Sequence, residues 1–91
     1  MEFIWDEAKR ESNIAKHGFD FLDIWQLFAG EYLYGAANPG PGGEERFLAT
    51  GLVNGLCATA ICTMRGETIR VISLRRARRN ERERYQALFG G

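Results

Sequence analysis

The stretch from Glu45 to Arg75, ERFLATGLVNGLCATAICTMRGETIRVISLR, decides the fold. It is rich in apolar and β-branched residues, and its Asn54-Gly55 pair is typical of a two-residue hairpin turn. It therefore predicts three consecutive antiparallel strands, at Glu45–Val53, Leu56–Met64 and Thr68–Arg75. The middle strand is the most apolar, so we expect it at the centre of the sheet.

The sequence on either side of this stretch predicts helices and shorter strands. In chain order these are an edge strand at Glu2–Trp5, a helix capped by Asp6 and ending at His17, an apolar helix between Asp20 and Gly30, a strand at Glu31–Ala37, a loop at Asn38–Gly43 and a helix at Ala77–Phe89. The order β-α-α-β-β-β-β-α indicates an α+β fold, with an antiparallel four- to five-stranded sheet packed with two N-terminal helices and one C-terminal helix. We expect a single domain over residues 1–91.

The first helix has an apolar and a polar side by spacing. The predicted core side comprises Trp5, Ala8, Ser12, Ala15 and Ile14. The predicted exposed stripe comprises Lys9, Asn13, Lys16 and His17.

The charge is unevenly distributed along the chain. Residues 1–45 carry nine acidic and three basic side chains, whereas residues 46–91 carry nine arginines and three glutamates. The net charge of zero is therefore the sum of −6 in the first half and +6 in the second. Arginine binds phosphate in a bidentate manner better than lysine does, so the basic half favours a nucleic-acid or other anionic partner.

Other features bear on the compartment and on cofactors. The opening Met1-Glu2-Phe3 is unlike a signal peptide, and no apolar run approaches the roughly 20 residues of a membrane span, so we expect a cytoplasmic protein without membrane contact. Cys57 and Cys62 fall on opposite faces of one predicted strand, about 16 Å apart, which excludes a disulfide between them. The sequence shows no metal-binding cysteine and histidine pattern, and we expect no metal and no cofactor.

The arginine-rich stretch near the end of the chain is the strongest candidate for chemistry. Strict alternation would place Arg75 on one face with Ile69, Val71 and Ser73, opposite Arg70, Ile72, Leu74 and Arg76. Glu81 lies on the apolar stripe of the last helix, where a carboxylate needs a partner, and an arginine of the preceding strand is the obvious one. The predicted pair is Arg75 with Glu81, with Arg65, Tyr85 and His17 around it, and it is either structural or part of an active site.

Arginines with a tyrosine and a histidine suit RNA cleavage without a metal ion. In that reaction the 2′-hydroxyl attacks the adjacent phosphate, and the protein positions the strand, neutralises charge and transfers protons. Tyr85 offers a hydroxyl and a ring that can stack on a base. His17 is either a proton-transfer group or a helix-terminal residue favoured by the helix dipole.

Several motifs resemble those of the BrnT family of toxins. They are Phe3-x-Trp5-Asp6-x-x-Lys9-x-x-x-Asn13-x-x-Lys16-His17-Gly18, Gly43-Glu44-Glu45-Arg46-Phe47, Thr63-x-Arg65-Gly66, Ile69-Arg70-Val71-Ile72-Ser73-x-Arg75-Arg76-Ala77 and Glu81-Arg82-x-x-Tyr85. The resemblance covers residues 3–85. The loop at Asn38–Gly43 departs from it, being richer in glycine and proline than in many relatives, and so do Glu83 and Arg84.

The resemblance implies a RelE-like fold and a ribonuclease that inhibits translation. It also implies a BrnA-like antitoxin that binds the toxin and joins it in repressing their operon, so that operator DNA is contacted through the antitoxin; a homodimer within that complex is a further prediction. The predicted catalytic residues are His17, Arg65, Arg75, Glu81 and Tyr85. The predicted RNA-binding residues are Lys16, Arg70, Arg76, Arg79 and Arg82.

Two other functions stay open at this point. One is a RelE-like partner-binding module without catalysis that acts only in transcriptional autoregulation with its antitoxin. The other is a small dimerising structural protein. Growth arrest on induction, rescued by the product of the neighbouring gene, would distinguish the toxin from both.

Overall fold

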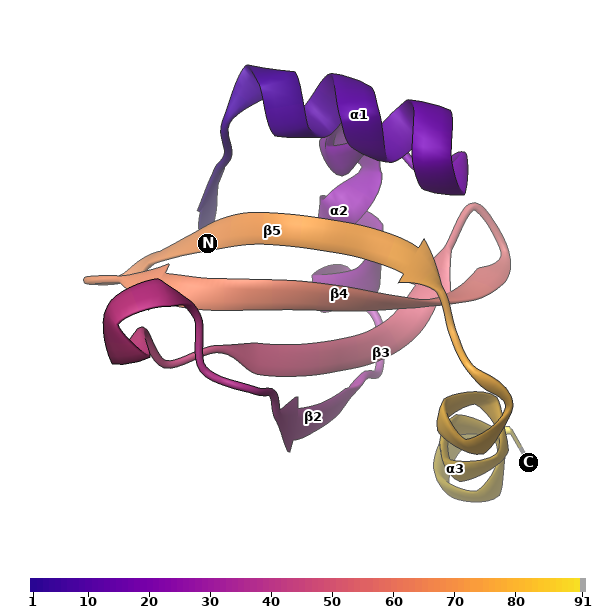
Figure 1. Ribbon diagram of the computed structural model, residues 1–91. Coiled ribbons are helices and arrows are strands. Elements are labelled where there is room, and N and C mark those ends of the chain that lie inside the picture. The colour runs from indigo at the N-terminus through magenta and orange to yellow at the C-terminus, as the bar shows by residue number, and fades with distance from the viewer. Residues whose placement is uncertain (91) are drawn as a thin grey trace.

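The computed structural model describes residues 1–90 and confirms the α+β fold, with a five-stranded sheet and three α-helices (Figure 1). The strands are β1 (Glu2–Ile4), β2 (Leu33–Ala36), β3 (Phe47–Val53), β4 (Leu56–Arg65) and β5 (Thr68–Arg76). The helices are α1 (Glu7–His17), α2 (Ile24–Ala29) and α3 (Arg79–Phe89), with short 3₁₀ turns η1 (Phe21–Asp23) and η2 (Pro41–Gly43). In this part of the chain, no helix is long and apolar enough to cross a membrane.

The strand order is β1-β5-β4-β3-β2, which confirms that the apolar strand Leu56–Arg65 is central. The β3–β4 connection is the predicted hairpin, because Asn54 and Gly55 both have positive φ, 52° and 77°. The pairs β2–β3, β3–β4 and β4–β5 are antiparallel, whereas β1 lies parallel to β5. The sequence predicted a wholly antiparallel sheet, but the parallel β1–β5 pair makes the sheet mixed at one edge.

Some elements are shorter than the sequence predicted. Strand β3 begins at Phe47 rather than Glu45. The Glu45 carbonyl lies before the strand and accepts a hydrogen bond from the side-chain hydroxyl of Thr63 on β4. Helix α3 begins at Arg79 rather than Ala77, since the Ala77 N–H donates to Cys57 O and so remains tied to the sheet. Strand β2 covers Leu33–Ala36 within the predicted range 31–37.

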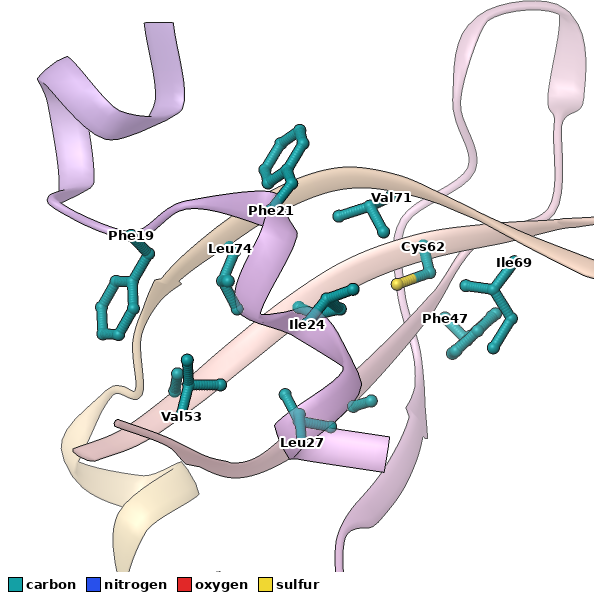
Figure 2. Close-up of a cluster of buried hydrophobic side chains, with 13 residues drawn as sticks. Phe19, Phe21, Ile24, Leu27, Phe47, Val53, Cys62, Ile69, Val71 and Leu74 are labelled. Carbon is teal, nitrogen blue, oxygen red and sulfur yellow. The ribbon is translucent and has the colours of Figure 1, made fainter. Parts of the chain in front are cut away.

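The hydrophobic core lies between η1–α2 and one face of the sheet (Figure 2). Its largest fully buried side chains include Phe21, Ile24 and Leu27 from η1–α2, and Figure 2 shows them over the sheet side chains. Each such side chain contributes about 1.5–3 kcal/mol through burial. Gly51 permits the close approach, because a Cβ there would lie 3.1 Å from Leu27 Cγ. The core thus uses one face of the sheet and leaves the other for different contacts.

Helix α1 does not present its predicted apolar side to the core, so that prediction was wrong for the helix, although Trp5, just before it, packs against the core as predicted. Ala8, Ser12, Ile14 and Ala15 are exposed, and the buried residue of the helix is Asn13, from the stripe predicted to face solvent. The Asn13 side chain accepts from Leu74 N (3.1 Å) and donates to Leu74 O (2.8 Å) and Phe19 O (2.9 Å). Because the outer edge of β5 has no strand partner there, an amide side chain serves in its place.

An irregularity in the β4–β5 pairing changes which residues of β5 share a face. Ile61 pairs with Ser73 but Cys62 pairs with Val71, so Ile72 is an extra residue in β5. As a result Ile69, Val71 and Leu74 all point to the core, and Arg75 shares the opposite face with Ser73 and Arg70. The prediction from strict alternation was wrong, because a bulge shifts the pattern by one residue.

Candidate active site

An ion pair between Arg75 and Glu81 joins the end of β5 to the first turn of α3. Arg75 Nη1 lies 2.8 Å from Glu81 Oε1, and Arg75 Nη2 lies 3.0 Å from Glu81 Oε2. The two side chains are only 15% and 13% exposed. The pairing predicted from the position of Glu81 on the helix is therefore present, in the bidentate geometry that fixes a guanidinium most firmly.

Two buried threonines extend this pair onto the sheet. The Thr59 hydroxyl donates to Glu81 Oε1 (3.0 Å) and lies 2.8 Å from the Thr50 hydroxyl. Ala49, Ala58 and Ala60 are in the core, so Thr50 and Thr59 point to the opposite face, and the hydrogen bond from Thr59 to Glu81 places α3 there. This network is therefore separated from the core by the sheet.

The sequence analysis missed these threonines, although a signal was present. Thr50 and Thr59 stand at equal distances from the Asn54-Gly55 turn, so a two-residue hairpin makes them direct partners. Two polar, β-branched residues facing each other on a half-buried sheet indicate a site for a further hydrogen bond.

The Glu81 carboxylate is held ionised by its partners. Hydrogen bonds from Arg75, the Arg78 backbone N–H (2.7 Å) and the Thr59 hydroxyl lower the pKa of Glu81 to about 2, with Arg75 the largest cause. A carboxylate with so low a pKa is a weak base. Its local role is to orient Arg75 and to close the first turn of α3 by accepting from the backbone N–H of the N-cap residue Arg78.

The pair borders a hollow between α3 and β2–β3, which we name the α3 hollow. It has a volume of about 120 Å³ and includes Tyr34, Leu48, Thr50, Asn80, Glu81 and Arg84 in its lining. Tyr85 lies one helical turn after Glu81, with its ring centroid 5.1 Å from that of Phe89. Burial raises the pKa of Tyr85, so its phenol stays protonated at neutral pH.

The structure places Arg65 at the other end of the sheet, away from this pair. Arg65 lies six positions after Thr59 on β4, a distance of about 20 Å along an extended strand. Arg65 Nη2 instead contacts Glu44 Oε2 at 3.0 Å. The expectation that Arg65 surrounds the Arg75–Glu81 pair was therefore wrong.

Lys16 and His17 lie beside a different stretch of β5. They line a hollow of about 220 Å³ together with Lys9, Ser12 and Ser73. Among residues 1–90, no hydrogen bond joins His17 to Arg75 or Glu81. Strand β5 links the hollow at His17 to Arg75, because Ser73, which lines that hollow, is two residues before Arg75 on the same face.

The remaining predicted RNA-binding arginines lie around the ends of β5 and α3. Arg70 is half-buried on the face away from the core, and Arg76 is exposed at the end of β5. Arg79 pairs with Glu83 on the surface (3.0 Å), and Arg82 donates to the carbonyl of Ala77. Three of the four therefore lie within two residues of a member of the Arg75–Glu81 pair.

Both cysteines are free, and they lie on opposite faces of β4 as predicted. Within the described part of the chain, no three histidine, cysteine, aspartate or glutamate side chains gather in a way that could hold a metal ion. The groups that could take part in a reaction at this site are the guanidinium, carboxylate, hydroxyl and phenol groups described above.

Comparison with known proteins shows the family to which the chain belongs. Among curated proteins, none matches the chain. A family model described as the ribonuclease toxin BrnT of a type II toxin–antitoxin system matches residues 5–81, which include α1, all of the β3–β5 stretch and the Arg75–Glu81 pair. Because this match covers most of the chain, the protein belongs to the BrnT family of ribonuclease toxins of type II toxin–antitoxin systems.

Proposed function

We propose that the protein is an endoribonuclease toxin that cleaves RNA without a metal ion, with Arg75 as its central catalytic residue. The observation that carries this proposal is the bidentate Arg75–Glu81 pair at the end of the open sheet face, supported by buried Thr59. A guanidinium fixed before substrate binds stabilises the charge of the phosphorane without a reorganisation cost. The donor set supports metal independence, since Oε1 of Glu81 already accepts three hydrogen bonds from the protein.

The proposed reaction is an attack by the 2′-hydroxyl on the adjacent phosphorus. The O2′–P bond forms and the P–O5′ bond breaks, which leaves a 2′,3′-cyclic phosphate and a free 5′-hydroxyl. The 2′-hydroxyl loses its proton to a base, for which His17 is the candidate, and O5′ receives a proton, for which the neutral phenol of Tyr85 is the candidate. Glu81 acts as a positioning residue through Arg75.

The surrounding basic residues are proposed to bind the RNA backbone. Lys16 lines the hollow beside His17, and Arg76 directly follows Arg75 at the end of β5. Arg79 and Arg82 lie on the first turns of α3, whereas Arg70 lies on β5 beyond Ser73, on the side away from Arg75. Arginine and lysine contacts to phosphates give affinity that falls with salt. The strand would thus be held across the end of β5.

The test is RNA cleavage by purified protein in excess chelator, compared between Arg75→Ala and a matched control. Arg10→Gln is that control, because Arg10 also makes a bidentate pair with a carboxylate, to Asp20 at 2.7 and 2.9 Å, but on α1. We expect Arg75→Ala to lose cleavage by about 100-fold or more while Arg10→Gln retains it in the folded protein.

Three results would contradict the proposal. Cleavage that disappears in chelator and returns with magnesium would exclude the metal-free reaction. A folded Arg75→Ala protein that cleaves as well as wild type would exclude the assigned site. Wild-type protein that cleaves no RNA but binds the neighbouring gene product would favour the alternative, a partner-binding module acting only in autoregulation.

A type II toxin has a cognate antitoxin, and we propose that it is BrnA-like and encoded beside this chain. The complex would contact operator DNA through the antitoxin. Co-expression with the neighbouring gene should yield a stable complex, and a toxin that elutes alone would contradict this partner. The mass of the complex would also show whether two toxin chains are present.

A further inference from the structure

A cavity lies at the end of the sheet opposite α3, and we name it the loop pocket. Its volume is about 710 Å³, within the range of small-molecule sites. Its lining includes Tyr34, Glu44, Arg46, Phe47, Met64 and Arg65. Figure 1 shows α3 and the η2 loop, which we define as residues 38–44, at opposite ends of the sheet. Pro39 and Glu44 of this loop line the loop pocket.

An aromatic platform forms one side of the loop pocket. The Tyr34 ring stacks on Phe47 with centroids 5.1 Å apart and an interplanar angle of 25°. Phe47 is in the core, yet Tyr34 is 71% exposed. A rigid ring held on its inner face and open on the other is the arrangement on which a nucleobase stacks.

Hydrogen-bonding groups stand at another side of the loop pocket. The Glu44 carboxylate lies between two arginines, with Oε1 3.3 Å from Arg46 Nε and Oε2 3.0 Å from Arg65 Nη2. Arg65 is half-exposed and keeps further N–H groups for a ligand. A guanidinium fixed in this way can donate to O6 and N7 of guanine.

The η2 loop is shaped around this arrangement. A Cβ at Gly40 would lie 2.5 Å from Arg46 Nε, so glycine there leaves room for the Arg46 side chain. The Gly40 N–H donates to Glu44 O (2.8 Å), which closes the loop. The glycine- and proline-rich segment thus has a structural use, to hold Glu44 and Arg46 at the loop pocket.

Tyr34 also links the loop pocket to the proposed cleavage site. It lines the α3 hollow as well as the loop pocket, so β2 borders both. Phe47 lies three positions before Thr50 on β3, about 10 Å along the strand, and the two side chains point to opposite faces of the sheet, so the RNA would pass over the β2 edge between the two sites. We propose, resting on the proposed function, that the loop pocket binds a nucleobase of the RNA a few nucleotides from the cleaved bond, with a preference for guanine.

The experiment measures binding of short 2′-O-methyl oligoribonucleotides, which lack the attacking hydroxyl, by fluorescence anisotropy. An all-uridine oligonucleotide is compared with versions that carry one guanosine. We expect Tyr34→Leu to weaken binding about 5- to 100-fold, while Tyr34→Phe stays within about twofold of wild type. Trp25→Leu is the matched control, because Trp25 is also an exposed aromatic residue, 58% exposed, but on α2.

A second variant tests the base preference. Arg65→Lys keeps the charge but loses the planar guanidinium, so we expect the preference for guanosine to fall about 10-fold while all-uridine binding changes little. A preference that survives this change would overturn the role of Arg65.

The outcomes separate the loop pocket from the cleavage site. If Tyr34→Leu binds RNA as wild type does, while cleavage still depends on Arg75, the loop pocket proposal is overturned and the proposed function stands. If Tyr34→Leu instead loses only the co-expressed antitoxin, the loop pocket is a protein-docking surface and the proposal is again overturned. If RNA binding depends on Tyr34 but wild type cleaves no RNA, the loop pocket stands and the proposed function fails.

Discussion

Replacement of Glu81 by glutamine tests how much the central ion pair stabilises the fold. The change removes the charge that Arg75 neutralises but keeps a side chain of similar size. The pKa of Glu81 is lowered from 4.5 to about 2, and a full shift of that size corresponds to about 3 kcal/mol of folding free energy. Glutamine retains neutral hydrogen bonds and the pair is partly solvated, so we expect a loss of about 1–2 kcal/mol at pH 7.

The pH dependence of this loss has a definite sign. Because the pKa of Glu81 is lower in the folded than in the unfolded protein, its charge stabilises the fold at pH values above about 4.5. That contribution disappears as the pH falls from about 4.5 towards 2, where the folded carboxylate also takes up a proton. The difference in unfolding free energy between wild type and Glu81→Gln should therefore shrink over this range.

The assay is urea denaturation followed by circular dichroism, at pH 7 and at several values down to pH 3. Glu83→Gln is the matched control, because Glu83 lies on the same helix and pairs with Arg79, but these two side chains are 65% and 86% exposed. We expect the control to change stability by less than about 0.5 kcal/mol. Equal effects of the two substitutions, or a Glu81→Gln effect that does not change with pH, would refute the reasoning.

Three further predictions concern the fold and its thiols. Asn13→Ala should lower the unfolding free energy by about 2–3 kcal/mol, because both backbone groups of Leu74 lose a buried partner; urea denaturation measures this, and a loss below about 0.5 kcal/mol would contradict it. Gly55→Ala should cost about 1–2 kcal/mol because φ is +77° there, which thermal denaturation would show as a lower Tm; an unchanged Tm would contradict the strain. Burial raises the pKa of Cys62 to about 12 and also raises that of half-buried Cys57, so thiol labelling of native protein should reach Cys57 slowly and Cys62 only on unfolding. Equal labelling rates would contradict the placement of Cys62 in the core.

Local patterns were sufficient for most of the fold. The Asn54-Gly55 turn requires positive φ at two consecutive residues, and few residue pairs besides Asn-Gly adopt that conformation without strain. The apolar run of β4 is best shielded from water when a strand pairs with each of its two edges, so its central place in the sheet was predictable. The family motifs were also local, and the match over residues 5–81 confirms the family that they indicated.

The site was predictable only where desolvation forced a contact. Glu81 lies on the inner stripe of α3, and a carboxylate there without a partner would be costly, so an arginine from the adjoining strand was expected. The short connection between β5 and α3 left Arg75 within reach, and the pair is present. Arg65 carried no such constraint, because an exposed arginine at a strand end is satisfied by water or by any nearby carboxylate.

By itself, then, the sequence determined the order of the elements, the hairpin register, the central strand and the Arg75–Glu81 pair, since each follows from neighbours in the chain or from a single burial cost. Tertiary structure decided the rest. The extra residue Ile72 changes which side chains of β5 face the core. The edge of β5 without a strand partner binds the side chain of Asn13, which is therefore buried. The loop pocket likewise exists only where β2, the η2 loop and the end of β4 meet. Each of these depends on groups far apart in the chain satisfying one another's hydrogen bonds or packing, and no local periodicity encodes that choice.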